Sequence, residues 1–267
     1  MGHCIAHVGV LKALLRAGIP IHSVAGTSGG ALVAGLFCAE RNVANLEEAV
    51  RRIGWKRLAG LTLFASKGLA TSEPIARFLS RMIAPRTRFS EMALPLAVTA
   101  TDLLTGETVI FRDDGCPVPE AVRISCTIPV VYAPVVWEGR LLVDGGVSDP
   151  LPVDAARALG AEFVVAVSLR HRPQELRNLL EVGLQMLDVT TASLAEMAKE
   201  HADFAIEVDV GNVDKWDLRQ AENLIALGEE AAKRDLPDLE RALRRHRSMW
   251  FRFLWVPVLK VLGLKPV

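Results

Sequence analysis

A single serine stands where a short apolar run changes into a helical pattern, and this transition constrains the fold more than any other stretch. The run Ser23-Val24-Ala25 leads into Gly26-Thr27-Ser28-Gly29-Gly30, and an Ala/Leu/Val-rich stretch follows to about Glu40. The pattern predicts a strand, a sharp turn at Ser28 and a helix that begins at Gly29. A glycine-rich structural turn is the alternative interpretation of this pentapeptide.

If the turn is a nucleophile elbow, each small residue has a reason to be there. Gly26 and Gly30 are expected to let the strand and the helix pack closely, and the serine is expected to be held in a strained conformation with its hydroxyl exposed. The amide of Gly29 would lie at the positive end of the helix dipole, where an oxyanion is stabilised.

The length and the charge of the chain limit the number of domains and the kinds of partner that it can have. The 267 residues are enough for one α/β domain with a large core, and no Pro/Gly/Ser-rich linker divides them. Lys+Arg and Asp+Glu both number 31, which gives no compositional support for a nucleic-acid groove. We expect one domain over residues 1–235 and a helical appendage over 236–267.

Cysteine spacing and hydropathy indicate the compartment. Cys4, Cys38, Cys116 and Cys126 form neither a Cys-x-x-Cys pair nor a disulfide ladder, so we expect free thiols, a reducing setting and a cytoplasmic protein. The N-terminus does not resemble a signal peptide, and no run of about 18 uncharged apolar residues predicts a membrane-spanning helix. Association with a membrane surface stays open.

Strands and helices alternate along the rest of the chain. Strands are expected at 94–100, 107–111, 141–143, 162–168 and 204–210, with helices between them and a long helix at about 174–199. The alternation predicts a single three-layer α/β domain, with a mainly parallel sheet covered by helices on both faces. Residues 54–68 are irregular and apolar, which fits a lid or channel wall as well as a loop packed on the core.

A serine hydroxyl needs a base, and the sequence offers two kinds. His171, His201 and His246 follow the serine, but each occurs in a context typical of structural or solvated residues. Asp144 ends a short strand and precedes Gly145 and Gly146, which allow a sharp turn that leaves the carboxylate uncovered. Taken alone, an Asp-Gly-Gly sequence is most often a tight turn.

Several motifs together resemble the patatin-like phospholipase family. They are Ala6-His7-Val8-Gly9-Val10-Leu11, Gly26-Thr27-Ser28-Gly29-Gly30, Ser125-Cys126-Thr127-Ile128-Pro129, Tyr132-Ala133-Pro134 and the stretch from Val143 to Pro152 around Asp144-Gly145-Gly146. They occur in the family's order between about Ala6 and Ser168. The set is far more specific than any single motif.

The resemblance implies a fold, a reaction and a site. It implies a catalytic dyad in which Ser28 is the nucleophile and Asp144 accepts its proton directly, with no histidine, metal or cofactor. It also implies hydrolysis of carboxylic esters of phospholipids, lysophospholipids or related lipids through an acyl-enzyme. A histidine-dependent α/β hydrolase is the weaker alternative.

The N-terminal stretch departs from the family pattern. The family has a strand and a Gly-Gly-Gly-x-Arg/Lys-Gly loop whose amides form the oxyanion hole, whereas this chain has Gly2, His3 and Cys4 at the last three loop positions. Losing one oxyanion donor costs roughly 10²–10³ in kcat. Two hypotheses follow: the true start lies upstream, or the protein is an impaired member that binds lipid or a partner without hydrolysis. We favour the first.

The C-terminal appendage is basic and then apolar. Arg241-Ala242-Leu243-Arg244-Arg245-His246-Arg247 precedes an aromatic stretch, and aromatic residues beside cations suit a bilayer interface. Peripheral membrane contact through residues 248–267 and packing on the body or a second subunit are equally weighted alternatives. The sequence gives no oligomeric state.

Overall fold

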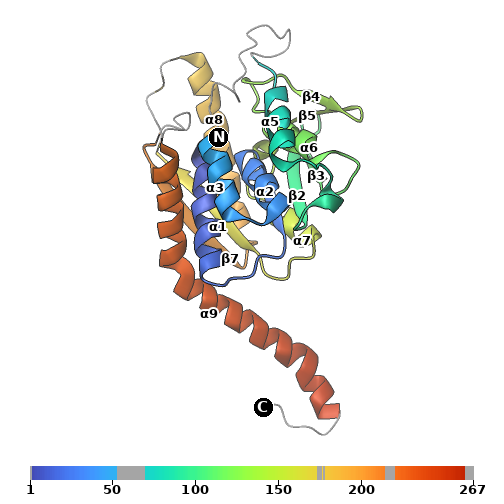
Figure 1. Ribbon diagram of the computed structural model, residues 1–267, viewed down its shortest axis with the longest axis vertical. Helices are drawn as coiled ribbons and strands as arrows, with labels where there is room; N and C mark the ends of the chain where they lie inside the picture. The colour runs from blue at the N-terminus through green and yellow to red at the C-terminus, as the bar shows by residue number, and fades with distance from the viewer. Residues whose placement is uncertain (1, 53–69, 173–175, 177, 214–219, 262–267) are drawn as a thin grey trace.

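The computed structural model describes residues 2–52, 70–172, 176, 178–213 and 220–261, and for residues 51, 52, 171 and 248–261 it describes the backbone alone. The predicted candidate lid at 54–68 therefore lies outside the described residues. Within these ranges, helices and strands alternate, so the α/β class is confirmed (Figure 1).

The helices lie close to where the apolar periodicity predicts them. The elbow helix α2 begins at Gly29 as expected. The α-helices are α1 (Ala6–Arg16), α2 (Gly29–Glu40), α3 (Val43–Arg52), α5 (Glu73–Ile83), α6 (Val118–Ser125), α7 (Val153–Ala158), α8 (Leu179–Lys199) and α9 (Ala221–Val261). Three short 3-10 helices accompany them: η1 (Gly2–Ile5), η2 (Phe89–Glu91) and η3 (Gly145–Val147).

The strands form one larger and one smaller sheet. They are β1 (Val24–Thr27), β2 (Leu96–Asp102), β3 (Thr108–Phe111), β4 (Val135–Trp137), β5 (Arg140–Asp144), β6 (Val165–His171) and β7 (Phe204–Gly211). The larger sheet has the order β1-β2-β5-β4 with β3 also on β2, and β6 pairs with β7. The short strand β4 was not among the strands predicted from the sequence.

Strand direction corrects the expectation of a mainly parallel sheet. In the described part of the chain, β1–β2 and β6–β7 are parallel, whereas β2–β3, β2–β5 and β4–β5 are antiparallel. The connections of β2 to β3 and of β4 to β5 are too short to contain a crossover helix, so these pairs are hairpins. The larger sheet is therefore mixed.

The register around β2 positions the candidate site. Val98 pairs with both β1 and β3, and Ala100 pairs with both β3 and β5, so β3 occupies one edge of β2 while β1 and β5 share the other. Thr27 lies opposite Thr99, and Asp144 lies opposite Ala100. The carboxyl ends of β1 and β5 therefore meet head to head in the middle of β2.

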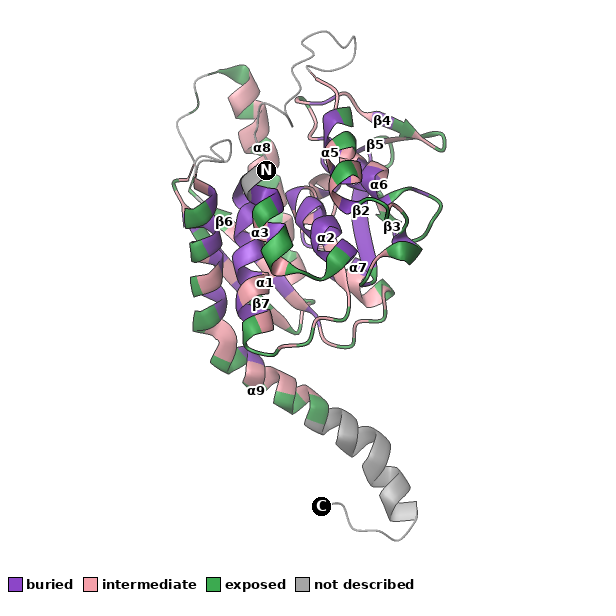
Figure 2. Ribbon diagram, in the orientation of Figure 1, coloured by how far each residue is buried: buried purple, intermediate pink, exposed green. Residues whose placement is uncertain are grey.

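The core lies around the elbow helix. Almost every side chain of α2 is buried, and α2 contacts β1, α5 and α6 (Figure 2). The expected free thiols are found: all four cysteines are free, and three of them, Cys38, Cys116 and Cys126, are buried. An element buried on all sides keeps its first turn rigid, and that turn carries the candidate nucleophile.

Helix α9 packs along α1 through glycine contacts. A Cβ atom at Gly9 would overlap the backbone of Ile225, and one at Gly228 would overlap the Ala6 carbonyl. The predicted domain boundary at 235/236 falls inside this continuous helix, and Leu239 beyond it is fully buried. Figure 1 shows α9 leaving the body farther on, towards the C-terminus.

None of the described helices is both long and apolar enough to cross a membrane.

Candidate active site

Ser28 occupies the turn between β1 and α2 and is held in a strained backbone conformation. Its φ of 54° and ψ of −126° lie outside the regions that L-residues favour, as the elbow interpretation predicts. Gly26 allows the tight turn, because a Cβ there would lie 2.8 Å from the backbone nitrogen of Ala31. The Ser28 carbonyl accepts the first helical hydrogen bond, from Leu32 at 3.2 Å.

Gly30 does not lie at a close contact between strand and helix, so the expectation for this position is wrong. A Cβ at Gly30 would meet no atom within 4 Å, so strand–helix packing does not require glycine there. The reason is geometric: only Gly26 faces the first turn of α2 across the elbow. Gly29 is buried at the start of α2, where its position in the first turn leaves its amide free of an intrahelical acceptor.

The hydroxyl of Ser28 donates a hydrogen bond to Asp144. The distance from Ser28 Oγ to Asp144 Oδ2 is 2.5 Å, although 116 positions separate the residues. The other oxygen, Asp144 Oδ1, accepts the amide of Gly146 at 2.8 Å. Gly145 must lack a side chain, since a Cβ there would lie 2.5 Å from the Thr99 carbonyl oxygen.

Residues 125–127 hold both halves of the pair. The Ser28 amide donates to Ser125 Oγ at 2.8 Å, and the Cys126 thiol donates to the Ser28 carbonyl at 3.1 Å. The Asp144 amide donates to the Thr127 carbonyl at 2.9 Å. Sequence reasoning gave these three residues no role; the only signal was their place in the Ser125–Pro129 motif.

Hydroxyl groups and α8 brace the surrounding turns. Thr27 Oγ1 lies 2.6 Å from Thr99 Oγ1 and donates to the Asp149 carbonyl at 2.8 Å, which ties the elbow to the stretch after Asp-Gly-Gly. From α8, Thr191 Oγ1 donates to the Gly146 carbonyl at 3.2 Å. The peptide units beside the carboxylate are thus fixed from two sides.

Burial changes the proton affinity of the carboxylate. Desolvation raises the pKa of Asp144 from 3.8 to about 6, and the hydrogen bonds from Ser28 and Gly146 offset only part of that increase. Asp149 behaves similarly: burial, and then the charge of Asp154, raise its pKa to about 6. In the described part of the chain, no cationic side chain forms a hydrogen bond with the carboxylate of Asp144 or of Asp149.

The histidines considered as alternative bases have other surroundings. His246 lies in α9 and meets the Phe163 ring edge to face, with centroids 5.3 Å apart. His201 follows α8 in an exposed turn. His171 ends β6, and its side chain lies outside the described residues.

The stretch matched to the oxyanion loop forms the 3-10 helix η1, which contacts α2. Gly2 and His3 are buried, and Cys4 is half-buried. His3 Nε2 lies 2.6 Å from the Val213 carbonyl oxygen, so this side chain binds the segment after β7. Burial raises the pKa of Cys4 to about 11, which keeps it a thiol at neutral pH.

Among the described residues, no group of three or more His, Cys, Asp or Glu side chains is arranged to hold a metal ion.

The chain is similar to known proteins in sequence and in fold. The family model described as "Patatin-like phospholipase" matches residues 2–157. An uncharacterised NTE family protein of Mycobacterium tuberculosis is 36% identical over 166 residues, covering 61% of this chain and 45% of that protein. The lysophospholipase NTE1 of Mycosarcoma maydis is 34% identical over 170 residues, covering 61% of this chain and 9% of that protein.

A solved structure shares the fold. VipD from Legionella pneumophila superimposes with a TM-score of 0.55 at 11% sequence identity, covering 89% of this chain and 65% of that chain. The chain spans less than half the length of the curated relatives named above.

Proposed function

Because this chain belongs to the patatin-like phospholipase family, we propose that it hydrolyses carboxylic esters of phospholipids, lysophospholipids or related lipids. Ser28 is the nucleophile and Asp144 the base in this proposal. The observation that carries it is the 2.5 Å hydrogen bond between Ser28 Oγ and Asp144 Oδ2 at a strained elbow. Lipid is the proposed substrate class because the matching family model is one of phospholipases.

The reaction would proceed in two steps. As Ser28 Oγ attacks the ester carbonyl carbon, its proton passes to Asp144; the tetrahedral intermediate then collapses to acyl-Ser28, and the alcohol leaves with that proton. Asp144 then takes a proton from water as the water oxygen attacks the acyl carbon, and this proton passes to Ser28 Oγ as the fatty acid leaves. No cofactor is needed.

The buried state of Asp144 supports its role as the base. An aspartate at its ordinary pKa is a weak acceptor for a hydroxyl proton, whereas a pKa of about 6 lies close to neutral pH. The low dielectric constant that raises this pKa also strengthens any hydrogen bond to the developing oxyanion. Burial of Asp144 therefore favours both proton transfer from Ser28 and stabilisation of the oxyanion.

Oxyanion stabilisation is assigned first to the elbow helix. The Gly29 amide at the start of α2 points along the helix dipole, and Gly30 leaves open space beside it. The remaining donors are proposed among Gly2, His3 and Cys4, because η1 contacts α2. Removing one such donor costs roughly 10²–10³ in kcat.

The alternative is an impaired family member that binds lipid or regulates a partner. It is favoured by one observation: the His3 side chain, at the family's basic loop position, contacts the Val213 carbonyl. Hydrolytic turnover separates the two proposals, because only the first predicts it.

The test uses a fluorophosphonate probe, which reacts with activated serines. We expect labelling of the wild type, none of Ser28→Ala and little of Asp144→Asn. Ser193→Ala is the matched control, because Ser193 is an exposed serine of α8 and its loss should leave labelling unchanged. Release of fatty acid from lysophosphatidylcholine should likewise be high in the wild type and in Ser193→Ala, low in Asp144→Asn and absent in Ser28→Ala. Labelling that survives in Ser28→Ala would refute the assignment of Ser28 as the nucleophile.

Membrane contact through residues 248–267 remains a separate proposal, since the side chains there lie outside the described residues. The basic run 241–247 precedes this stretch and would favour anionic lipid. Flotation with anionic vesicles, with and without residues 248–267, tests it. We propose a cytoplasmic protein with peripheral membrane contact.

A further inference from the structure

Helix α8 lies beyond the stretch that matches the family model. That match ends at residue 157, whereas α8 spans Leu179–Lys199. Its contacts with the body include strand β6 and the 3-10 helix η3, which follows Asp144 directly. The family motifs therefore assign no role to any residue of α8, although the helix touches the turn that holds the candidate base.

Three hydroxyl side chains lie close together in the middle of α8, and one of them is used differently from the others. A threonine or serine inside a helix commonly donates its hydroxyl to the carbonyl four residues earlier. Thr190 and Ser193 do so, at 3.0 and 3.1 Å. Thr191 instead donates to the Gly146 carbonyl of η3 at 3.2 Å. Its hydroxyl therefore connects two elements of the fold.

Thr191 lies on the side of α8 that faces the body. Ala195 and Ala198, four and seven positions farther on, pack against a small cluster of buried apolar side chains. Side chains at this spacing share one face of a helix. Thr191 is half-buried, whereas the neighbouring Thr190 is exposed. The hydroxyl of Thr191 thus reaches the site turn from a packed face of the helix.

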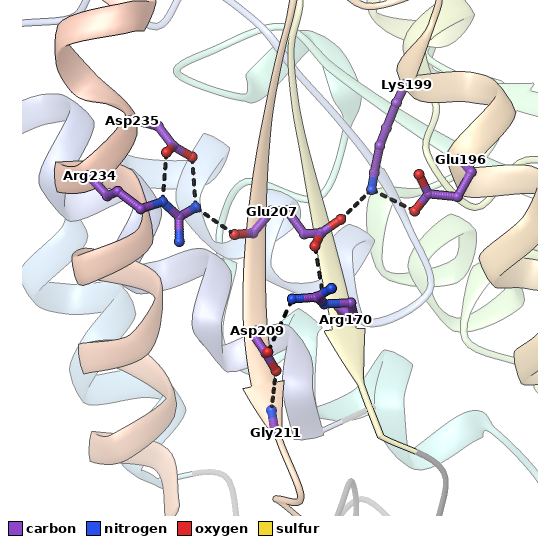
Figure 3. Close-up of polar contacts among 8 residues, drawn as sticks. All are labelled: Arg170, Glu196, Lys199, Glu207, Asp209, Gly211, Arg234 and Asp235. Carbon is purple, nitrogen blue, oxygen red and sulfur yellow. Dashed lines mark hydrogen bonds and ion pairs between the residues drawn. The ribbon is translucent and has the colours of Figure 1, made fainter.

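Ion pairs hold the C-terminal end of the same helix on the smaller sheet (Figure 3). The Lys199 ammonium lies 2.7 Å from a carboxylate oxygen of Glu196 on α8 and 2.7 Å from one of Glu207 on β7. Glu207 also pairs with Arg170 of β6 at 3.1 Å. The Lys199 side chain is 15% exposed, so water screens these pairs less than it screens surface pairs. Thr191 lies about two turns from this anchor, on a helix that is fixed at its end.

The turn that receives the Thr191 hydroxyl needs a glycine beside the carboxylate. A Cβ at Gly146 would lie 3.1 Å from Asp144 Oδ1, which is closer than an ordinary van der Waals contact. Without a side chain, however, the backbone at Gly146 is free to adopt many conformations. The position therefore gains a close approach to Asp144 and loses rigidity.

Hydrogen bonds on both sides of Gly146 restore that rigidity. On one side, the Gly146 amide donates to Asp144 Oδ1 at 2.8 Å, and the Gly145 carbonyl of the same peptide unit accepts the amides of Ser148 and Asp149. On the other side, the Gly146 carbonyl accepts the Thr191 hydroxyl. The second restraint comes from a distant helix, so it depends on the tertiary structure.

We propose that Thr191 is a positioning residue for the candidate base. By holding the Gly146 carbonyl, its hydroxyl keeps the turn in the conformation in which the Gly146 amide donates to Asp144 and Asp144 accepts the Ser28 hydroxyl. Thr191 acts through the turn and contacts neither of the two reacting side chains. This inference rests on the proposed function, because Asp144 serves as a base only if Ser28 attacks an ester.

The experiment compares three substitutions in the full chain. Thr191→Val keeps the shape of the side chain and removes the hydroxyl. Thr191→Ser keeps the hydroxyl and serves as the rescue. Thr190→Val is the matched control, because it removes a hydroxyl that donates within α8 itself. For each protein, kcat and KM on a soluble ester are measured between pH ~5 and pH ~8.

We expect Thr191→Val to lower kcat roughly fivefold with little change in KM, because the carboxylate is held less well. The fall in kcat/KM at low pH should move up by about half a pH unit, since a loosened Gly146 amide stabilises the ionised Asp144 less. Burial raises the pKa of the nearby Cys126 thiol well above its ordinary value, so this thiol stays neutral throughout. Asp149 titrates in the same range as Asp144 but is present in every variant.

Thr191→Ser and Thr190→Val should match the wild type in kcat and in pH profile. The proposal is overturned if the low-pH fall stays in place in Thr191→Val, if the loss is confined to KM, or if Thr190→Val has the same effect. A purely structural role of Thr191 would lower the stability of the fold without moving the pH profile.

Hydrogen exchange of the Gly146 amide, followed by NMR without substrate, tests the same contact independently of turnover. We expect exchange to be roughly fivefold faster in Thr191→Val and unchanged in the other two variants. Unchanged exchange in Thr191→Val would overturn the positioning role. If the wild type releases no fatty acid while Gly146 exchange responds to Thr191→Val alone, the proposed hydrolysis fails and the restraint of the site turn by Thr191 stands.

Discussion

Replacing Asp144 by Asn should make the folded protein more stable while abolishing hydrolysis. Burial raises the pKa of Asp144 from 3.8 to about 6, which means that the folded state disfavours the charged form. At 1.36 kcal/mol per pKa unit, the ionised carboxylate lowers the free energy of unfolding by about 3 kcal/mol at pH 7. Asn removes that charge and keeps an oxygen that can accept the Gly146 amide.

The pH dependence of this effect has a definite sign. The folded pKa lies above the unfolded one, so the carboxylate does not destabilise the fold below pH ~4, and its cost grows up to pH ~6 and is constant above. The stability difference between Asp144→Asn and the wild type should be about 3 kcal/mol at pH 7 and roughly half of that at pH 5.

Urea unfolding followed by circular dichroism measures this difference. Asp114→Asn is the control: hydrogen bonds from Ser90 lower the pKa of Asp114, so its charge favours folding and its loss should give no gain in stability. The reasoning is refuted if Asp144→Asn is no more stable than the wild type at pH 7, or if the gain is the same at pH 5.

Three further predictions concern the pH profile, a helix crossing and the elbow. Below pH ~6, kcat/KM on a soluble ester should fall about tenfold per pH unit, because Asp144 becomes protonated. The His171→Ala variant should show the same fall in kcat/KM at low pH. If the fall disappears in this variant, the proposed Ser28–Asp144 dyad is refuted. Gly9→Ala should lower the free energy of unfolding by more than ~2 kcal/mol, because the added Cβ overlaps α9. The control Gly183→Ala has open space around the added Cβ, so it should raise the free energy of unfolding by up to ~1 kcal/mol. Urea titrations measure both changes. Ser125→Ala should lower kcat roughly tenfold with little change in KM, because the Ser28 amide loses its acceptor and the elbow loosens; a change confined to KM would contradict this.

Local residue patterns were enough to locate the elbow. Helix α2 begins at Gly29 because an apolar, strongly helix-forming run follows the turn, and Gly26 allows that turn to be tight. The strained φ of Ser28 and the need for glycine at position 26 were also predictable, since both are set within a few residues of the serine. The family motifs identified Asp144 as the partner.

Strand direction and long-range contacts were not predictable in the same way. An apolar strand pattern carries no information on the direction of its neighbour, so the mixed sheet and β4 emerged only in the structure. Packing around Gly30 was mispredicted because the close approach of strand and helix is confined to Gly26.

Local sequence thus determined the kind of residue at the candidate site, and the tertiary structure determined where those residues meet. Ser28 and Asp144 come together because β1 and β5 share one edge of β2 and end at adjacent positions on it. The same convergence buries Asp144, which raises its pKa. Both effects depend on contacts between distant segments, which local sequence patterns do not encode.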